Sequence, residues 1–585
     1  MPRAISIRNI STEPNFGNKV LIWFLDRLLG IKKMDQLYRQ HEMQGLSKED
    51  FSDKLIQILA LDIHGIAELQ RKTPKSGPVV IASNHPFGGI EGVILARIIG
   101  EVRPDLKVLA NKGLGIFKEI SEYFIFTNPL SPNDPKNGPS LRQCVKHVKS
   151  QGALLIFPAG KVSYYQKAKS GISEHIWNKL VGRLVSIDKC QYIPIFVNGK
   201  NSAGFYRIEK VYFKLRMLLL GHQLLNKTGA KIVINTGNAV QHEQFDKQLS
   251  HSDKAMLCRA LSYVQEQRWR YQWPENTVTE QLPIIKEIET AQLVVEIEAL
   301  PSDQLLLENK DYSVYFGYQS QLPSVVREIT RLREIVFRMH NEGSGQSLDT
   351  DKFDATYTHL FIVKNVGKKI VGAYRIGFTD RLTQKQGPEG LYLQKMFNFK
   401  SSFANQQGPC MEMGRSFLIP EMQGSYQGLL LLWKGIGRLA AKFPQYRTLY
   451  GTVSISKLFD PRSVQIIAQG LVDAQSASQV EPVNSFEFNT HIEIDELAQK
   501  INLRDHFTAF LTSIEEDGKD IPVLARQYLK MGAKFHALGI DKSFNHTPGL
   551  LLSVHFPSAP EKLLKLYVGQ NDYKAYRDWD ANSSR

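Results

Sequence analysis

The sequence predicts an α/β protein of two domains, because the chain is long and its two halves carry different element patterns. Its 585 residues exceed what a single ordinary hydrophobic core organises. In the first half, short β-branched runs alternate with helical patterns, which is typical of a sheet whose strands are joined by helices. The elements expected there are strands at 77–83, 106–109, 153–157, 192–197 and 231–235 and a helix at 141–150.

The second half begins after a polar stretch at roughly residues 275–290 that contains Pro283. We therefore expect domains at 1–280 and 290–585. The pattern after the boundary is mixed α/β. Its expected order is strand 293–297, helix 324–339, strands 359–364, 369–378 and 412–418, and a Leu-rich helix at 428–442.

The composition is that of a globular, basic protein. Hydrophobic residues make up 42% and charged residues 22%, and the formal net charge is +15. Such a balance favours an acidic partner, either nucleic acid, an anionic membrane or an acidic carrier protein, unless it serves solubility alone. The four cysteines are scattered without a CxxC pair, so we expect neither a disulfide framework nor a metal site, and a reducing compartment fits.

Membrane contact is expected at a surface only. No signal peptide is visible, and no apolar run reaches the roughly 20 residues that cross a bilayer. Residues 16–31 form a predicted helix rich in Leu, Trp and Phe with lysine and arginine beside it. It fits a membrane-associating helix and an ordinary core helix equally well.

The first candidate site follows the strand at 77–83. His85 stands at the strand end in Asn-His-Pro-Phe-Gly-Gly-Ile-Glu, and Glu91 closes that block. A neutral imidazole can take a proton from an attacking alcohol near pH 7, and a carboxylate can fix its tautomer. A structural histidine in a capped turn is the alternative on these residues alone.

Further blocks place this site in a family context. The segment Phe-Pro-Ala-Gly-Lys ends at Lys161, and Tyr-Ile-Pro-Ile-Phe starts at Tyr192. Together with the Asn-His-Pro block, they resemble the glycerolipid acyltransferases related to lysophosphatidate acyltransferases, over about residues 70–245. The resemblance implies His85 as catalytic base and Glu91 as its acidic partner. It also implies acceptor-binding roles for Lys112, Phe157, Pro158, Gly160 and Lys161.

Two departures from that family bear on the acceptor. The family places Asp five residues after the histidine, where Ile90 stands here, and the carboxylate comes one residue later as Glu91. The family's Phe-Pro-Glu-Gly block has Ala159 at its third position. That block helps to bind glycerol phosphate in the family, so the change argues against lysophosphatidate. The hemolysin-like subgroup has the same spacing and the same alanine.

The second candidate site gathers charged residues from several elements, unless they form only structural ion pairs. Glu412 and Arg415 lie on one expected strand, where a spacing of three puts them on opposite faces unless a bulge near Gly414 intervenes. Four further residues precede them, namely Arg333, Asp351, Asp354 and Arg375. A carboxylate such as Glu412 can act as the base that frees an amine to attack a thioester. The aspartates suit an ammonium group, and Arg375 or Arg415 suits a carboxylate.

Residues 321–456 resemble the GNAT-type N-acyltransferases that acylate ornithine and, more distantly, the acyl-homoserine lactone synthases. The matching residues are Arg333, Phe337, Asp351, Asp354, Arg375, Glu412 and Arg415, with the block from Leu431 to Gly437 and the block from Tyr450 to Ser456. The resemblance extends over most of residues 290–570.

In this order the two halves look like the bacterial bifunctional ornithine lipid synthases. The resemblance implies N-acylation of an amino acid, ornithine being favoured, with a 3-hydroxyacyl group, and then O-acylation of the lyso-lipid hydroxyl. Acyl carrier protein would donate both chains, and its acidity would suit the basic charge. We expect no cofactor, no metal and no nucleic acid, and a peripheral place on the cytoplasmic face of the inner membrane.

Two alternatives remain at this point. One is a lysophospholipid acyltransferase with an accessory GNAT-like domain. The other is a pore-forming or membrane-binding protein, which the absence of a secretion signal and of a long amphipathic or spanning segment disfavours.

Overall fold

A computed structural model describes residues 30–580 except 129–134, 136, 167–170, 210–221, 267–272, 274–280, 401–402, 404–408, 425, 474–478, 487–491 and 501. Most of the predicted membrane-associating helix at 16–31 therefore lies outside the described residues. Contacts divide the chain into two compact units. The first unit is Met1–Tyr271 with Asn489–Asp520, and the second unit is Gln272–Phe488 with Ile521–Arg585. The predicted ranges 1–280 and 290–585 differ from this division at 489–520, a segment that they assign to the second domain.

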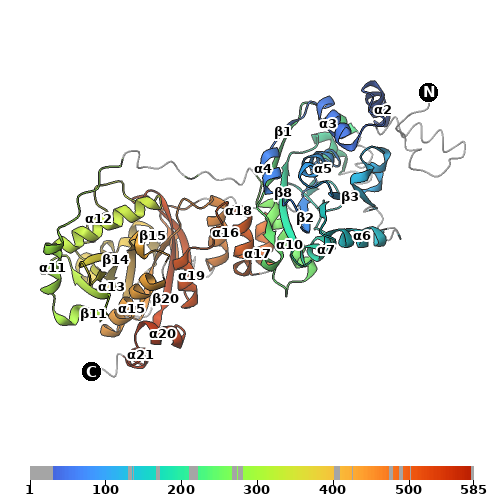
Figure 1. Cartoon of the computed structure of the whole chain (residues 1–585). Coiled ribbons are helices and arrows are strands. Elements are labelled where there is room, and N and C mark those ends of the chain that lie inside the picture. Colours follow the sequence, from blue (N-terminus) through green and yellow to red (C-terminus); the bar gives the residue numbers. More distant parts are fainter. Residues whose placement is uncertain are drawn as a thin grey trace, which may run out of the picture. The chain divides into compact units, whose positions relative to one another are not determined.

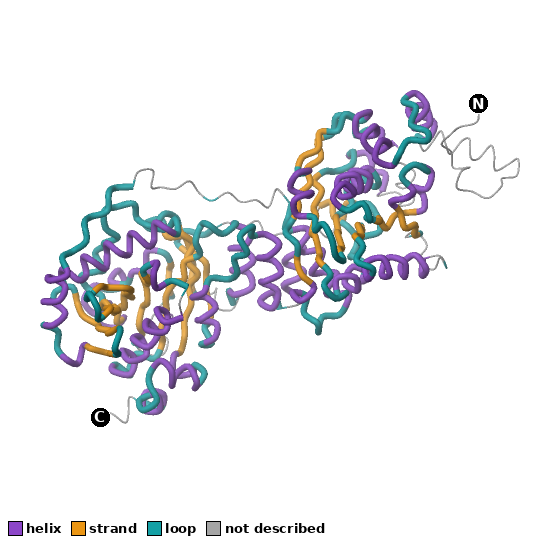
Figure 2. The backbone as a smooth tube through the Cα atoms, viewed as in Figure 1, coloured by secondary structure: helices purple, strands orange, loops and turns teal. Residues whose placement is uncertain are grey.

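The first unit is built on one eight-stranded sheet (Figures 1 and 2). Its order is β1 (Asp62–His64), β9 (Lys231–Thr236), β8 (Gln191–Asn198), β2 (Val79–Ser83), β5 (Ala153–Ile156), β3 (Lys107–Asn111) and β4 (Phe124–Thr127), with β10 (Val240–Gln241) on β8. All pairs are parallel except those of β8 with β9 and with β10. The predicted strands and the α/β class of this half are confirmed.

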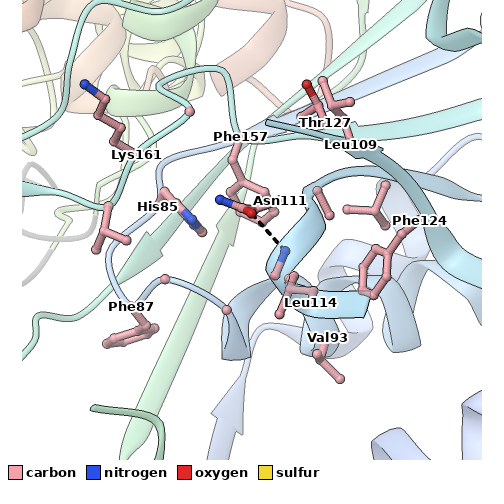
Figure 3. A pocket seen from close by; sticks show the side chains of 18 of the residues that line it. His85, Phe87, Val93, Leu109, Asn111, Leu114, Phe124, Thr127, Phe157 and Lys161 are labelled. Atoms are coloured by element: carbon pink, nitrogen blue, oxygen red, sulfur yellow. Dashed lines mark hydrogen bonds between the residues drawn. The ribbon is translucent and has the colours of Figure 1, made fainter. Parts of the chain in front are cut away.

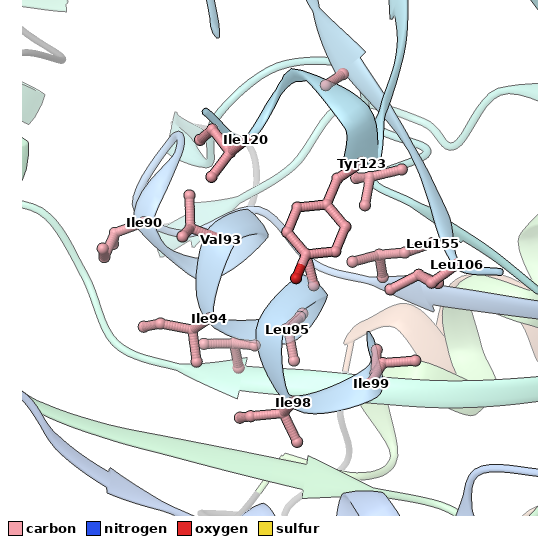
Figure 4. Close-up of a cluster of buried hydrophobic side chains, with 14 of the residues drawn as sticks. Ile90, Val93, Ile94, Leu95, Ile98, Ile99, Leu106, Ile120, Tyr123 and Leu155 are labelled. Carbon is pink, nitrogen blue, oxygen red and sulfur yellow. The ribbon is translucent and has the colours of Figure 1, made fainter. Parts of the chain in front are cut away.

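Helix α5 (Ile90–Val102) is the centre of the first unit's core. Its apolar residues face all round the helix, and Ile94, Leu95 and Ile99 are fully buried (Figure 4). Helices α3 (Lys48–Ile58) and α4 (Ile66–Lys72) pack on it. Elsewhere on the sheet, α7 (Lys179–Val185) and α10 (His251–Tyr263) pack on each other and on β2 and β8. The remaining helices include α2 (Ile31–Gln40), α6 (Asn137–Lys149) and α8 (Ala203–Glu209).

The segment 489–520 completes the first unit from the far end of the sequence. Its helices α17 (Ile492–Lys500) and α18 (Phe507–Ile514) pack on α10, and α18 also packs on β10. The Asn238 amide donates to the carbonyls of Thr512 (3.2 Å) and Glu515 (2.8 Å). Glu516 forms ion pairs with Lys72 (2.9 Å) and Arg71 (3.0 Å).

The second unit has its own eight-stranded sheet. The order is β11 (Leu305–Glu308), β12 (Tyr312–Tyr318), β13 (Thr358–Lys364), β14 (Lys369–Phe378), β16 (Cys410–Leu418), β17 (Thr448–Ser454), β20 (Thr547–His555) and β19 (Lys534–Asp541). Every pair is antiparallel except β16 with β17, which run parallel over 410–413 and 448–451. One parallel pair inside an antiparallel sheet puts the ends of β16 and β17 at the same edge.

Helix α12 (Pro323–Met339) packs on β14 and β16, and α15 (Tyr426–Lys442) packs on β11–β14. Both match the predicted helices. The predicted strand at 293–297 is wrong, because it forms helix α11 (Thr290–Glu298). There Leu293 and Ile297, one helical turn apart, are buried while Val295 is exposed, which is a helical period rather than a strand period. Smaller helices follow at α13 (Thr379–Gln386), α16 (Pro461–Leu471), α19 (Val523–Lys530), α20 (Glu561–Tyr567) and α21 (Tyr573–Arg577).

Two small two-stranded sheets accompany the main ones. β6 (Tyr164–Gln166) pairs with β7 (Gly171–Ser173), and β15 (Phe397–Phe399) pairs with β18 (Val480–Pro482). Within the described part of the chain, no helix has both the length and the apolar character needed to cross a bilayer.

Candidate active sites

The first site begins where β2 ends. The Asn84 side chain is tied to β8, since its Nδ2 donates to the Val197 carbonyl (2.9 Å) and its Oδ1 accepts from the Val197 amide (2.7 Å). This fixes the chain just before His85. Gly88 then adopts φ +96°, a left-handed conformation that favours glycine, and turns the chain into α5.

His85 and Glu91 meet across this turn. His85 Nδ1 lies 2.9 Å from Glu91 Oε1, and the Glu91 side chain is only 1% exposed. The same carboxylate accepts from the amides of Phe87 (2.9 Å), Gly88 (3.0 Å) and Gly89 (3.1 Å). Burial alone would raise the pKa of Glu91, but the imidazole and these amides lower it to about 2. The carboxylate is therefore ionised at neutral pH and positions the ring through Nδ1.

A cavity of about 740 Å³ opens beside this pair. The ring centroids of His85 and Phe157 are 4.6 Å apart at its wall. Apolar side chains such as Leu114 and Phe124 line the part further from Lys161 (Figure 3). An apolar cavity next to an oriented imidazole can hold an acyl chain with its reactive end near the base.

The structure brings most of the residues predicted for this site together. Phe157, Pro158, Gly160 and Lys161 all line the cavity. Lys112 does not join them, because it is exposed on the short helix 112–116 and is absent from the described lining. Its neighbour Asn111 lines the cavity instead and caps that helix through the Gly113 amide (2.9 Å).

Two residues of this site escaped the sequence analysis. The buried Glu174 carboxylate accepts from the main-chain amide of His85 and from Trp177 Nε1 (3.0 Å), and burial raises the pKa of Glu174. Lys227 lines the cavity at 7% exposure. Each is a single charged residue without a motif, so nothing local in the sequence signals either one.

The second site centres on Glu412 in β16. Its carboxylate accepts from the hydroxyls of Tyr357 (3.0 Å) and Tyr450 (3.2 Å) and from the Leu393 amide (3.2 Å). Burial raises the pKa of Glu412 to about 7, although these donors and Arg375 partly oppose the rise. A carboxyl group with a pKa near neutrality exchanges a proton readily at physiological pH.

The predicted arginines and aspartates form one buried network beside it. Arg333 binds Asp349 (2.7 Å) and Asp354 (3.0 Å), and Arg375 binds Asp351 (2.6 Å) and Asp354 (3.0 Å). Burial alone would raise the pKa of Asp354, but the two arginines hold it below its usual range. The aspartates predicted to bind an ammonium group thus bind arginines of the chain itself.

A bulge brings Arg415 to the Glu412 side of the strand. Opposite β14, the register shifts between Gly414 and Phe417, and Arg415 has φ +51°. Arg415 then donates to the Tyr392 hydroxyl (2.8 Å), next to the Leu393 amide that binds Glu412. The predicted bulge is therefore present. Glu342, a further buried carboxyl group near Arg415, has its pKa raised to about 7 by burial and had no sequence signal.

Metal-ligand groupings do not occur among the described residues, where no three His, Cys, Asp or Glu side chains are placed to hold an ion. The four cysteines are all buried as free thiols.

Both halves match family models of acyl-transferring enzymes. Residues 27–268 match a model described as "Acyltransferase", and residues 332–434 match one described as "Acetyltransferase (GNAT) domain". The chain is accordingly an acyltransferase, with an acyltransferase-type region in the first unit and a GNAT-type region in the second.

Two kinds of curated relative are similar to this chain. The glycine N(alpha)-acyltransferase of Bacteroides thetaiotaomicron is 28% identical over 292 residues, which are 46% of this chain and 85% of the relative. The lyso-glycine lipid O-acyltransferase of Phocaeicola vulgatus is 25% identical over 228 residues, which are 37% of this chain and 77% of the relative. The solved 1-acyl-sn-glycerophosphate acyltransferase of Thermotoga maritima has 12% identity and a TM-score of 0.25, over 42% of this chain and 85% of that chain.

Proposed function

We propose that this chain makes an amino-acid lipid by two successive acyl transfers. The second unit would join a 3-hydroxyacyl group to the α-amine of an amino acid, and the first unit would esterify the new hydroxyl with a second acyl chain. The observation that carries the proposal is the presence of two separate proton acceptors, His85 beside an apolar cavity and Glu412 with a pKa of about 7. One relative is named for N-acyl transfer and another for O-acyl transfer, which supports assigning one transfer to each unit.

In the amide-forming step, Glu412 takes a proton from the amino group, directly or through a water. The nitrogen attacks the thioester carbonyl, the C–N bond forms and the C–S bond breaks, and the protonated Glu412 returns the proton to the leaving thiolate. A base with a pKa near neutrality suits this step, because it is largely ionised just above pH 7 and still holds a proton well.

In the ester-forming step, His85 Nε2 takes the proton of the 3-hydroxyl group. The oxygen attacks the second thioester, the C–S bond breaks, and the imidazolium returns the proton to the leaving thiolate. Because Nδ1 faces Glu91 at 2.9 Å, the ionised carboxylate stabilises the imidazolium while it exists.

For the acceptor, we propose a small amino acid in place of ornithine, which the sequence resemblance favoured. A second ammonium group, as in ornithine, needs an acidic partner. Asp351 and Asp354 already bind Arg375 and Arg333. Relatives that are named for glycine agree with this choice.

We further propose acyl carrier protein as donor for both steps, at the cytoplasmic face of the membrane. The net charge of +15 supports an acidic donor protein, and the lipid product needs a membrane to enter.

The test is lipid mass spectrometry of a heterologous bacterial host that expresses the full chain. Purified protein is then given a 3-hydroxyacyl carrier thioester with labelled glycine or labelled ornithine. We expect an N-(3-hydroxyacyl) amino acid followed by its acyloxyacyl form, with glycine preferred. Acylation of lysophosphatidate alone, without labelled amino-acid product, would contradict the proposal and support the lysophospholipid acyltransferase alternative.

A further inference from the structure

The cavity of the first unit is lined to receive an anion. Its described lining contains two lysines, Lys161 and Lys227, and neither an aspartate nor a glutamate. Lys161 is half-buried and follows the exposed Gly160, so it lies near the cavity edge. Lys227 is 7% exposed and therefore lies deeper in the wall.

Lys227 is positioned beside the catalytic turn. Its Nζ lies 4.5 Å from the ring centroid of Phe87, whose own amide donates to Glu91. The Nζ group donates to the Lys200 carbonyl at 2.9 Å, which is its one hydrogen-bond acceptor among the described residues. An ammonium group has three N–H donors, so a ligand can take up donors that this carbonyl does not.

Burying such a charge costs free energy unless a partner compensates it. Burial lowers the pKa of Lys227 to about 8, while the charge of Glu91 opposes the fall. The side chain therefore remains mostly protonated at pH 7. The Lys200 carbonyl, the Phe87 ring and the Glu91 charge, which Lys227 shares with His85, compensate this cation only in part, so a negative charge inside the cavity would stabilise it further.

We propose that Lys227 binds the carboxylate of the lyso-lipid acceptor and thereby selects acceptors that end in an amino-acid carboxylate. This inference rests on the function proposed for the first unit. In an N-(3-hydroxyacyl)glycine, six bonds separate the reactive hydroxyl oxygen from the carboxylate carbon, ~7 to 8 Å when extended. Lys227 contacts Phe87, two residues after His85, and both His85 and Lys227 line the cavity, so the proposed acceptor would lie between these two side chains.

The donor's phosphate is a less suitable partner for Lys227. We place the carrier-bound thioester on the side of Lys161, which is less buried, whereas Lys227 is buried beside the turn that holds the base. The acceptor is the substrate whose headgroup must enter together with the reacting hydroxyl. Lys227 would therefore affect the KM of the acceptor and leave the KM of the acyl donor unchanged.

The experiment compares two acceptors on the purified full-length protein with one acyl carrier thioester. The acceptors are N-(3-hydroxyhexadecanoyl)glycine and its primary amide, which lacks only the charge. Wild-type protein should prefer the acid by ~10- to 100-fold in kcat/KM, the usual effect of a hydrogen bond between charged groups. Lys227→Met should lose that preference through a higher KM for the acid, with the amide value kept within about threefold.

Two further variants make the test specific. Lys254 is equally buried in the same unit, donates to Ser186 Oγ at 3.1 Å and does not line the cavity, so Lys254→Met should keep the preference for the acid. Lys227→Arg keeps the charge and should keep part of the preference. The acid-to-amide ratio of the wild-type protein can be measured even if a variant fails to fold.

Several outcomes would overturn the inference. Equal use of acid and amide by wild-type protein would do so, and so would a Lys227→Met variant that still prefers the acid or that weakens both acceptors alike. These results leave the proposed ester-forming activity intact. If wild-type protein acylates neither compound but acylates lysophosphatidate, the proposed function fails and this inference fails with it.

Discussion

Glu91 and Glu412 are both buried glutamates at candidate catalytic sites, and their pKa values move in opposite directions. Glu91 has three backbone amides and an imidazole around it, and its pKa falls to about 2. Glu412 has two tyrosine hydroxyls and one amide, and burial raises its pKa to about 7. The donors around each buried carboxylate therefore decide its protonation state at neutral pH. The first stays charged to orient a base, and the second can itself accept a proton.

The largest effect should come from removing the imidazole of the first site. We expect His85→Ala to slow ester formation by ~1000-fold, because general-base catalysis by a positioned side chain is lost. Amide formation should continue, so the monoacylated lyso-lipid should accumulate in lipid mass spectra. His64→Ala, at an exposed histidine of the same unit, is the matched control. Complete diacyl product from His85→Ala would remove the imidazole from the mechanism.

Replacing the proposed base of the second site should slow its reaction somewhat less. Glu412→Gln should lower amide formation by ~100-fold near pH 7.5, since the amide side chain cannot take a proton. Ester formation on supplied lyso-lipid should be retained, and the exposed Glu389→Gln should change neither rate. Normal amide synthesis by Glu412→Gln would show that another group acts as base.

The two pKa values predict different pH profiles for the two steps. Glu412 becomes active as it loses its proton, so amide formation should rise about tenfold between pH 6 and pH 8 around the pKa of about 7. Glu91, with a pKa of about 2, stays ionised over this whole range and should add no inflection to ester formation. Initial rates with each purified acceptor measure both profiles. A flat amide profile would contradict the role of Glu412.

The smallest predicted effect concerns thermal stability, which should change in the first unit and not in the second. Asn238→Ala removes two hydrogen bonds to 489–520, which should cost ~1–2 kcal/mol and lower the heat-inactivation midpoint of ester formation by a few degrees. The heat-inactivation midpoint of amide formation should stay unchanged, because Asn238 belongs to the first unit. The residual ester-forming and amide-forming activities after brief heating measure the two midpoints. If both midpoints fall in parallel, the two units unfold together.

Local sequence patterns predicted much of the fold and the proximity of His85 to Glu91. The strand end at Ser83 and the helix start at Ile90 place His85 and Glu91 on one turn, so their contact follows from short-range structure. The bulge at Gly414 was also predictable, since only a bulge reconciles a spacing of three with a shared face. The strand at 293–297 was mispredicted because a short apolar run fits either period.

Long-range contacts left no such signal. Lys227 and Glu174 approach the His85 turn from distant segments, and each is one charged residue in an unremarkable context. The same holds for the packing of α18 on β10, which joins residues more than 250 positions apart. The pairing of Asp351 and Asp354 with arginines likewise depends on how α12, β14 and their loop meet in space.

The path of the backbone has a consequence for how such a protein can arise. The chain passes from the first unit to the second after Tyr271, returns at Asn489 and leaves again after Asp520. A single cut at any of these points leaves at least one unit without a part of itself. Separating the two units into two chains, each with all of its own segments, would therefore require α17 and α18 to be moved next to the rest of the first unit.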